Sequence, residues 1–276
     1  MSSLIFLNIF VLGGIAFAAA FVLYLVSQKF MVEADETASR IVAVLPQANC
    51  GGCGKAGCAD FASACAKADK DTFANLYCPV GGVAVMKKVA EIKGFETGEK
   101  VPTVAVLRCQ GTCENAPAKV AYDAVSSCRI ANRISSGQSG CPDGCLRLGD
   151  CVSACKFGAL SFDEATGMPA IDASKCVSCG ACVKVCPRGL FEIRAQSPKG
   201  GMVYVACRNK QKGAVARKNC KTACIGCMRC AKVCDLIKIE NNLSYIPQEV
   251  DADAFGADLK QNCPTGAIVY KEGQRE

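Results

Sequence analysis

The number and spacing of its cysteines constrain this chain more than any other feature. The 276 residues include 23 cysteines, a density found in small disulfide-stapled secreted domains or in proteins whose thiolates bind metal. Histidine is absent, which excludes Cys/His zinc fingers, histidine-ligated haem, Rieske centres and Ser–His or Cys–His nucleophile pairs. The remaining chemistry belongs to thiolates, and their spacing must decide between the two classes.

The clearest motif is Cys176-x2-Cys179-x2-Cys182-x3-Cys186-Pro187. Two-residue spacers let three thiolates wrap one 4Fe-4S cubane, while the fourth cysteine, followed by proline, reaches a neighbouring cluster. Zinc ribbons instead bring two separated C-x2-C pairs. The motif therefore favours iron-sulfur clusters over zinc, and over disulfides still more.

Two-cluster ferredoxins exchange ligands between their motifs, and the same exchange is expected here. One cluster would bind Cys155, Cys176, Cys179 and Cys182. Its partner would bind Cys141, Cys145, Cys151 and Cys186. The spacers after Cys141 and Cys145 differ from the usual two residues, which weakens the assignment of Cys141 most.

A third motif, Cys224-x2-Cys227-x2-Cys230-x3-Cys234, precedes a distant Cys263-Pro264. By the same rule, Cys263 would complete the cluster of Cys224, Cys227 and Cys230. Where three further cysteines would be expected the sequence reads DADAFGADLKQN, so this half predicts one cluster and leaves Cys234 without a role. The cysteine spacing of residues 141–155 recurs in residues 220–234, which indicates an internal duplication.

A fourth pattern lies closer to the N-terminus, in the glycine-rich strings ANCGGCGKAGC and LYCPVGG. Its cysteines are Cys50, Cys53, Cys58 and Cys78. Glycines let backbone amides approach the sulfurs of an anionic cluster. A redox disulfide between Cys50 and Cys53 is the alternative, but four cysteines in one compact stretch favour a further 4Fe-4S cluster.

The cysteines outside these motifs support one more hypothesis. Cys109 and Cys207 each end a β-like run, and Cys128 or Cys220 follows. These four thiolates could bind a fifth cluster between the two repeats, so at least four clusters are expected and five under this hypothesis. Cys65 lies in a helix-like segment and suits a small core residue, and Cys113 has no predicted role.

The first residues predict a membrane anchor. From Leu4 to Val26, 23 residues carry no charge and are largely apolar; as a helix they rise about 35 Å, against about 30 Å for a hydrocarbon core. No Lys or Arg precedes them, which argues against a cleaved signal peptide. Because the first basic residues, Lys29 and Arg40, follow the span, the cysteine-rich body is expected on the cytoplasmic side of the inner membrane.

Two β-like runs divide the rest of the chain. VPTVAVLRC ends at Cys109 and GMVYVAC ends at Cys207, each after a charged or glycine-containing stretch, which places boundaries near residues 98 and 198. We predict an α+β fold with one transmembrane helix. The expected parts are an anchor (1–28), a small 4Fe-4S domain (29–98), a two-cluster ferredoxin-like domain (99–198) and a degenerate ferredoxin-like domain with at least one cluster (199–276).

Charge indicates the kind of partner. The net charge is +7, but aromatics are only 7% and tryptophan is absent, which argues against nucleic-acid binding. Residues 195–234 contain nine Lys or Arg and no Asp or Glu. This stretch could steer an acidic ferredoxin; a solvated face or compensation of cluster charge are the alternatives. No G-x-G-x-x-G fingerprint follows a strand, so NAD and flavin are expected on other subunits.

Taken in order, these parts resemble the B subunit of the Rnf complex, a ferredoxin:NAD oxidoreductase. The resemblance covers nearly the whole chain, including the string GCLRLGDCVSAC, and the Cys50 to Cys78 domain is also similar to one in corrinoid iron-sulfur proteins. It implies that the chain accepts electrons from reduced ferredoxin and passes them to membrane and peripheral subunits, with NAD reduction driving sodium-ion or proton translocation. Lys156 and Asp235 depart from the proline that usually follows the fourth cysteine.

Two other functions compete with this one. The first is an equivalent membrane-anchored polyferredoxin in a related complex that reduces a redox-sensing transcription factor, which co-purifying flavin-bearing subunits would help to separate. The second is a protein that stores or assembles clusters, for which a membrane span is unexpected.

Overall fold

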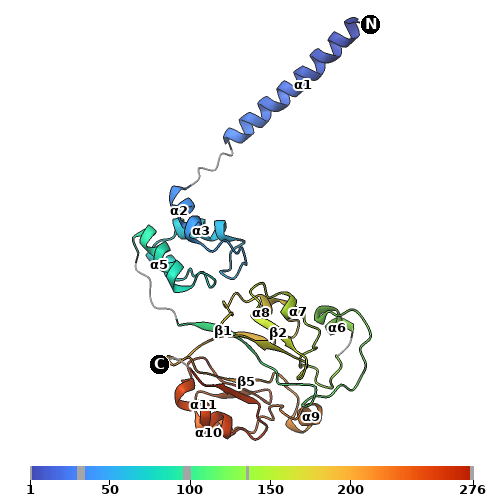
Figure 1. The fold of residues 1–276 in the computed structure, drawn as a ribbon, viewed down its shortest axis with the longest axis vertical. Helices are drawn as coiled ribbons and strands as arrows, with labels where there is room; N and C mark the ends of the chain where they lie inside the picture. Colours follow the sequence, from blue (N-terminus) through green and yellow to red (C-terminus); the bar gives the residue numbers. More distant parts are fainter. Residues whose placement is uncertain (1, 30–34, 96–100, 135–136, 274–276) are drawn as a thin grey trace.

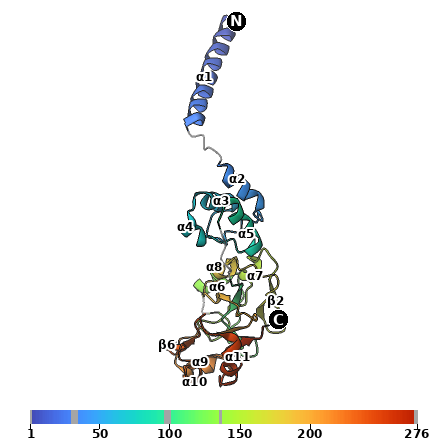
Figure 2. The same cartoon turned by 90° about the vertical axis from the view of Figure 1, so that its left-hand side faces the viewer.

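A computed structural model describes residues 2–29, 35–95, 101–134 and 137–273, with side chains in the first helix described from residue 10 to 26. Helix α1 (Ser2–Lys29) extends away from the rest of the molecule in both views (Figures 1 and 2). Over the described residues, no helix is found whose length and apolarity would suffice to cross a membrane. The structure therefore does not show the expected span from Leu4 to Val26, which stays a prediction.

Four short helices build the first domain. They are α2 (Glu36–Val44), α3 (Cys58–Lys67), α4 (Lys70–Ala74) and α5 (Gly82–Lys93). Asp35 caps α2 by accepting from the Thr37 amide, and Asp69 and Thr72 form a capping box on α4, so both helices begin at side chains that satisfy free N–H groups. Apolar positions then pack into one core, around the fully buried Phe61.

The next module begins with β1 (Thr103–Leu107), which pairs antiparallel with β4 (Phe191–Ala195). Between them lie α6 (Cys128–Ile134), α7 (Asp150–Ser153), the hairpin of β2 (Leu160–Asp163) and β3 (Met168–Ile171), and α8 (Ala181–Val185). Helices α7 and α8 and the sheets enclose a small core in which cysteines pack with Leu160, Leu190 and Phe191. First and last strands that pair around two inner loops are typical of small ferredoxin-like folds.

The last module repeats this topology. Strand β5 (Met202–Val205) pairs antiparallel with β8 (Ile268–Lys271), and β6 (Lys238–Glu240) forms a hairpin with β7 (Leu243–Tyr245). Helix α9 (Gly213–Asn219) and helix α10 (Arg229–Val233) precede the hairpin. The mixture of helices and strands in an α+β fold is thus confirmed.

Helix α11 (Ala252–Gln261) occupies the segment where further cysteines would be expected. Asp251 caps it by accepting from the Asp253 amide, and Ala252 and Leu259 are buried in the module core. Cys234 is buried in the same core. In this module the described residues replace a second cysteine loop by a packed helix.

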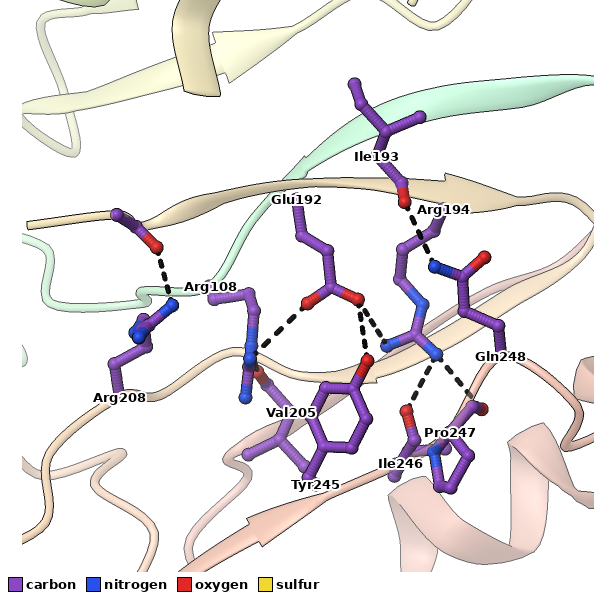
Figure 3. Close-up of polar contacts among 11 residues, drawn as sticks. Arg108, Glu192, Ile193, Arg194, Val205, Arg208, Tyr245, Ile246, Pro247 and Gln248 are labelled. Atoms are coloured by element: carbon purple, nitrogen blue, oxygen red, sulfur yellow. Dashed lines mark hydrogen bonds and ion pairs between the residues drawn. The ribbon is translucent and has the colours of Figure 1, made fainter. Parts of the chain in front are cut away.

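A buried polar network joins the two modules (Figure 3). Nη1 of Arg108 and Nη1 of Arg194 lie 3.3 and 3.6 Å from the carboxylate of Glu192. Arg108 also donates to the carbonyl of Val205, and Arg194 to the carbonyl of Ile246. Both carbonyls belong to the last module, so the two arginines of one module satisfy the backbone of the other.

Tyr245 completes this network from the last module. Its hydroxyl donates to Glu192 at 3.1 Å, and its ring lies 5.0 Å from the guanidinium carbon of Arg108. Burial lowers the pKa of Arg108, and the charge of Glu192 opposes that effect. The network holds two cationic side chains and one anionic side chain, and its contacts link the two modules into one body.

The domains follow one another along the molecule. Both views place the first domain between α1 and the two ferredoxin-like modules, with α9 to α11 at the end away from α1 (Figures 1 and 2). The first domain contacts the first module directly, since Lys184 donates to the carbonyl of Gly51. The three cysteine-containing units therefore follow one another in one direction (Figures 1 and 2).

Candidate iron-sulfur sites

The site expected at Cys155, Cys176, Cys179 and Cys182 is brought together by the structure. These four cysteines line one cavity with about 370 Å³ of empty space, part of it open to solvent. Helix α8 carries Cys182, α7 ends just before Cys155, and the other two occupy the loop before α8. The Ala105 amide of β1 donates to the Cys176 sulfur at 3.5 Å.

The site expected in the last module is also brought together. Its cavity has about 360 Å³ of empty space, and the cysteines that line it are Cys224, Cys227, Cys230 and Cys263. Cys227 is exposed, and the neighbouring Met228 keeps 58% of its surface accessible. The loop that carries Cys227 therefore reaches the surface of the protein.

The partner site of the first module differs from the expected set. Cys145, Cys151 and Cys186 share a cavity of about 330 Å³ with Cys128, whereas Cys141 is not among its lining residues. Cys128 begins helix α6, which packs through Ala131 against Leu146. The structure thus places Cys128, rather than the expected Cys141, with Cys145, Cys151 and Cys186.

The internal duplication could have revealed this exchange. Leu148 stands where the second repeat has Cys227, so the first repeat lacks one sulfur and must take it from elsewhere. Cys128 supplies a sulfur from α6, outside the repeated spacing. Motif spacing alone contains no signal for a thiol that arrives from another helix.

Cys141 instead lies in a cavity between the two modules. That cavity has about 390 Å³ of empty space and is lined by Cys109, Cys141, Cys207 and Cys220, with Cys145 at its edge. The hypothesised fifth set named Cys128 in place of Cys141. Three of its four members, Cys109, Cys207 and Cys220, line this cavity. The fourth, Cys128, lines the neighbouring cavity, in the place predicted for Cys141.

The first domain places three of the four predicted cysteines, Cys53, Cys58 and Cys78, close together. The side chain of Asn49 accepts from the Cys58 amide at 2.8 Å and so closes residues 49–58 into a loop. Burial raises the pKa of Cys78, and the charges of Cys53 and Cys58 raise it further, which shows that these thiols lie close together. Cys50 begins the same loop.

Backbone amides point at sulfurs in the first domain, in both cavities of the first module and in the cavity between the modules. Contacts of 3.4 to 3.5 Å run from the amides of Gly52, Gly81, Ala105, Gly111, Cys145 and Leu190 to the sulfurs of Cys50, Cys78, Cys176, Cys109, Cys109 and Cys186, respectively. Such N–H···S bonds favour anionic thiolates and tune the potential of a bound cluster.

The electrostatics of the cavities suit metal-bound thiolates. Burial, together with the charges of neighbouring cysteines, raises the pKa of Cys109, Cys145 and Cys151 to about 12. Burial likewise raises the pKa of Cys182 to about 11. At neutral pH these sulfurs would become thiolates only with a cationic group between them, which a metal cluster supplies.

The described residues contain no group of three or more Cys, Asp or Glu side chains placed to hold a single metal ion. A cubane does not need such a group, because each of its four irons takes its own sulfur. Four thiols around a space, with amides directed at the sulfurs, fit a 4Fe-4S cluster.

Comparison with known families agrees with this chemistry. Residues 140–190 match a family described as a 4Fe-4S dicluster domain, and residues 45–72 match one described as "Putative Fe-S cluster". The fold and the cysteine cavities thus define a protein of the ferredoxin-type iron-sulfur class.

Relatives are similar along nearly the entire chain. The B subunit of the Na⁺-translocating ferredoxin:NAD⁺ oxidoreductase complex of Acetobacterium woodii is 38% identical, over 98% of this chain and 80% of its own length. The B subunit of the ion-translocating oxidoreductase complex of Methanosarcina acetivorans is 38% identical, over 98% of this chain and all of its own length. The proton-translocating counterpart from Clostridium ljungdahlii is 38% identical, over 90% and 86%. The chain belongs to the family of B subunits of ion-translocating, or Rnf, oxidoreductase complexes.

Proposed function

We propose that this chain is the electron-transfer subunit of a membrane-bound Rnf complex. In this proposal it accepts electrons from reduced ferredoxin and passes them to membrane partners, while NAD reduction elsewhere in the complex is coupled to sodium-ion or proton translocation. Support comes from the family and from the names of two relatives, which specify ferredoxin, NAD⁺ and a translocated ion. When bound, a 4Fe-4S cluster takes up and releases one electron at a time.

The proposal rests on a series of neighbouring thiol-lined cavities, called the file below. The amide of Cys224, from the last module's cavity, hydrogen-bonds to the sulfur of Cys207 in the central cavity. Cys145 lines both the central cavity and the next one. Cys151 in α7 and Cys155 just after it line two neighbouring cavities, and so do Cys186, just after α8, and Cys182 in α8, so the chain leaves no cavity isolated from the next.

The file continues into the first domain through Gly52. A Cβ built on Gly52 would lie 2.9 Å from the Cα of Cys179, which means that the first-domain loop touches the loop of the neighbouring cavity. The residues of this chain thus hold and orient neighbouring sites. Such an arrangement serves transfer of single electrons and requires no substrate pocket.

The exposed Cys227 and its surroundings support a docking site for ferredoxin. Gly213 packs against Ile225, so the basic segment around Lys210 and Lys212 lies beside the cysteine loop. The exposed basic residues between positions 210 and 232 are Lys210, Lys212, Arg217, Lys218, Lys221, Arg229 and Lys232. A positive surface beside the exposed Cys227 would steer an acidic partner to the point of electron entry.

Stopped-flow oxidation of reduced ferredoxin by the anaerobically purified full chain tests this function. Each ferredoxin gives up one electron, which this chain gains. Charge reversal at Lys210, Lys212 and Lys218 should slow the reaction at low salt and flatten its salt dependence, whereas reversal at the exposed Lys87 and Lys88 of α5 should change neither. An unchanged salt dependence in the first variant would exclude the docking site, and no oxidation of ferredoxin would contradict the function.

We also propose that α1 anchors the chain in the inner membrane, with the cysteine-rich body on the cytoplasmic side. The uncharged run from Leu4 to Val26 and the basic residues that follow it support this topology. The full chain should stay with membranes after alkaline carbonate extraction, and deletion of residues 2–28 should release it. Protease should cut the body in inverted vesicles only; extraction of the full chain, or cleavage in right-side-out vesicles, would contradict the proposal.

A further inference from the structure

We propose that a fifth 4Fe-4S cluster binds in the cavity between the two modules, ligated by Cys109, Cys141, Cys207 and Cys220. The inference rests on the proposed iron-sulfur function and deepens it, because it adds a site whose ligands come in pairs from two modules. Each module contributes the cysteine that follows its first strand and the first cysteine of its repeated motif.

Local symmetry is the first argument. Cys109 and Cys207 each lie two residues beyond the strand that opens their module, β1 and β5. The Cys109 sulfur accepts from the amides of Gly111 and Cys145. The Cys207 sulfur accepts from the amides at the equivalent positions, Asn209 and Cys224. Two unrelated core cysteines would have no reason to share this pattern of donors.

The donors to the second pair of sulfurs are also arranged for thiolates. The side-chain amide of the buried Asn209 donates to the Cys141 sulfur at 3.3 Å, and the Thr222 hydroxyl lies 3.3 Å from the Cys220 sulfur. The guanidinium of Arg188 binds the carbonyl of Cys141 at 3.3 Å and so brings a positive charge to this wall. Hydrogen-bond donors and a cation favour the anionic form of the sulfurs.

Packing distinguishes this site from an ordinary core. Buried cysteine usually acts as a small apolar residue that fills space. Here four cysteines instead line one cavity of about 390 Å³, part of it open to solvent, comparable to the 360 and 370 Å³ of the two cavities whose motifs are clearest. The cavity thus has the size and the thiol lining of the sites whose motifs are clearest.

The position of the site gives it a role. Its wall includes Cys145 of one neighbouring cavity, and Cys207 accepts from the amide of Cys224 in the other. Without a redox group here, the two flanking sites would be separated by the whole width of this cavity. The site therefore joins the last module to the rest of the file.

Iron and sulfide analysis of the anaerobically purified full chain tests the site, together with low-temperature electron paramagnetic resonance after dithionite reduction. Five clusters require about 20 irons per chain, and four require about 16. A value near 20 is expected; a value at or below 16 in protein with fully loaded motifs would overturn the proposal. Because dithionite is the reductant, this result does not depend on whether ferredoxin is the partner.

Variants identify the ligands. Cys207→Ser with Cys220→Ser should remove about four irons per chain and one reduced-cluster signal, while Cys113→Ser, at an exposed thiol outside the cavities, should remove none. Full iron and an unchanged spectrum in the double variant would contradict the assignment. Asn209→Ala keeps all four sulfurs and should lower the reduction potential of one cluster only; unaltered potentials throughout would argue against a cluster beside Asn209.

Discussion

At the scale of single residues, Glu192 is the only acidic side chain in the network between the modules as the structure describes it. Two buried guanidiniums, those of Arg108 and Arg194, lie within 3.6 Å of it. Replacing it by glutamine leaves both cations without a counter-charge in a nearly dry environment. Removing one partner of a buried ion pair typically costs about 3 kcal/mol or more, because the remaining charge stays desolvated.

We therefore expect Glu192→Gln to destabilise the junction by about 3 kcal/mol. The measurement is the guanidinium concentration at which the cluster absorbance is half lost, under anaerobic conditions. Glu114→Gln is the matched control, because Glu114 also pairs across the modules, with Lys221, but both side chains are more than 60% exposed; it should cost less than about 0.5 kcal/mol. Equal shifts in the two variants would show that the buried network does not join the modules.

Cys65 and Cys113 should differ sharply in reactivity. Cys65 is fully buried, and burial raises its pKa to about 11, so at pH 8 about one thiol in a thousand is ionised. Cys113 is exposed. Iodoacetamide at pH 8, followed by peptide mass spectrometry, should label Cys113 and leave Cys65 unmodified, whereas both should react in the unfolded chain. Labelling of Cys65 at the rate of Cys113 in the folded protein would contradict its place in the core.

At the scale of elements, the loop of the first domain meets the loop before α8 with no space to spare. A Cβ on Gly52 would lie 2.9 Å from the Cα of Cys179 and 3.0 Å from a ring carbon of Pro79. Gly52→Ala should therefore weaken the contact between the two units by about 1–3 kcal/mol, the usual cost of overpacking. It should also slow electron transfer between the first domain and the ferredoxin-like modules.

Hydrogen exchange can measure this effect, since residues 50–53 and 176–184 should both lose protection in Gly52→Ala. Lys184→Ala is the control: it removes only the partly exposed hydrogen bond to Gly51 and should leave exchange close to that of the parent protein. Unchanged protection in Gly52→Ala would mean that the two loops do not depend on each other.

How far the sequence could predict the sites depended on where their sulfurs come from. Cys176, Cys179 and Cys182 lie in one unbroken motif, and the exchange rule then assigned Cys155, in agreement with the cavity that they line. Spacing gave no indication of Cys128, the thiol that α6 brings into the neighbouring cavity. The repeat contained the correcting signal: Cys207 goes with Cys220, so Cys109 should have been paired with Cys141, the first cysteine of its own repeat.

The elements themselves were predictable where local patterns decide them. The β-like runs before Cys109 and Cys207 became β1 and β5. For the segment of α11, the sequence showed only that the expected cysteines are missing. The helix itself was not predicted, because its stability comes from burial of Ala252 and Leu259 in a core assembled from distant residues. The buried arginines could not be foreseen either, since Arg108 and Arg194 gain their partners only when the modules meet.

At the scale of the whole molecule, the thiol-lined cavities take the place of much of an ordinary core. The apolar cluster of the first module has eight buried members, two of which are Cys151 and Cys182. Metal binding in such proteins is coupled to folding. Removal of iron by a chelator under reducing conditions should therefore loosen the cysteine loops, because the repelling, desolvated sulfurs lose the group between them.

Hydrogen exchange before and after iron removal measures this loss. Residues 141–155, 176–186 and 220–234 should lose most of their protection. Helix α5 should lose less, since Met86, Val89 and Ala90 pack in an apolar core of their own. Equal protection with and without iron would show that the chain folds independently of its clusters.

The division of sulfurs among distant parts of the chain also determines the order in which the sites can be completed during translation. A ribosome makes the protein from its N-terminus, so the thiols of the first domain are complete once Cys78 has emerged, long before Cys207 and Cys220 exist. The shared cavity between the modules, and the one that needs Cys263, can receive iron only near the end of translation or after it. A nascent chain would thus be loaded from the N-terminal end towards the C-terminal end, and premature termination would leave intact early sites with no way to connect them to the missing ones.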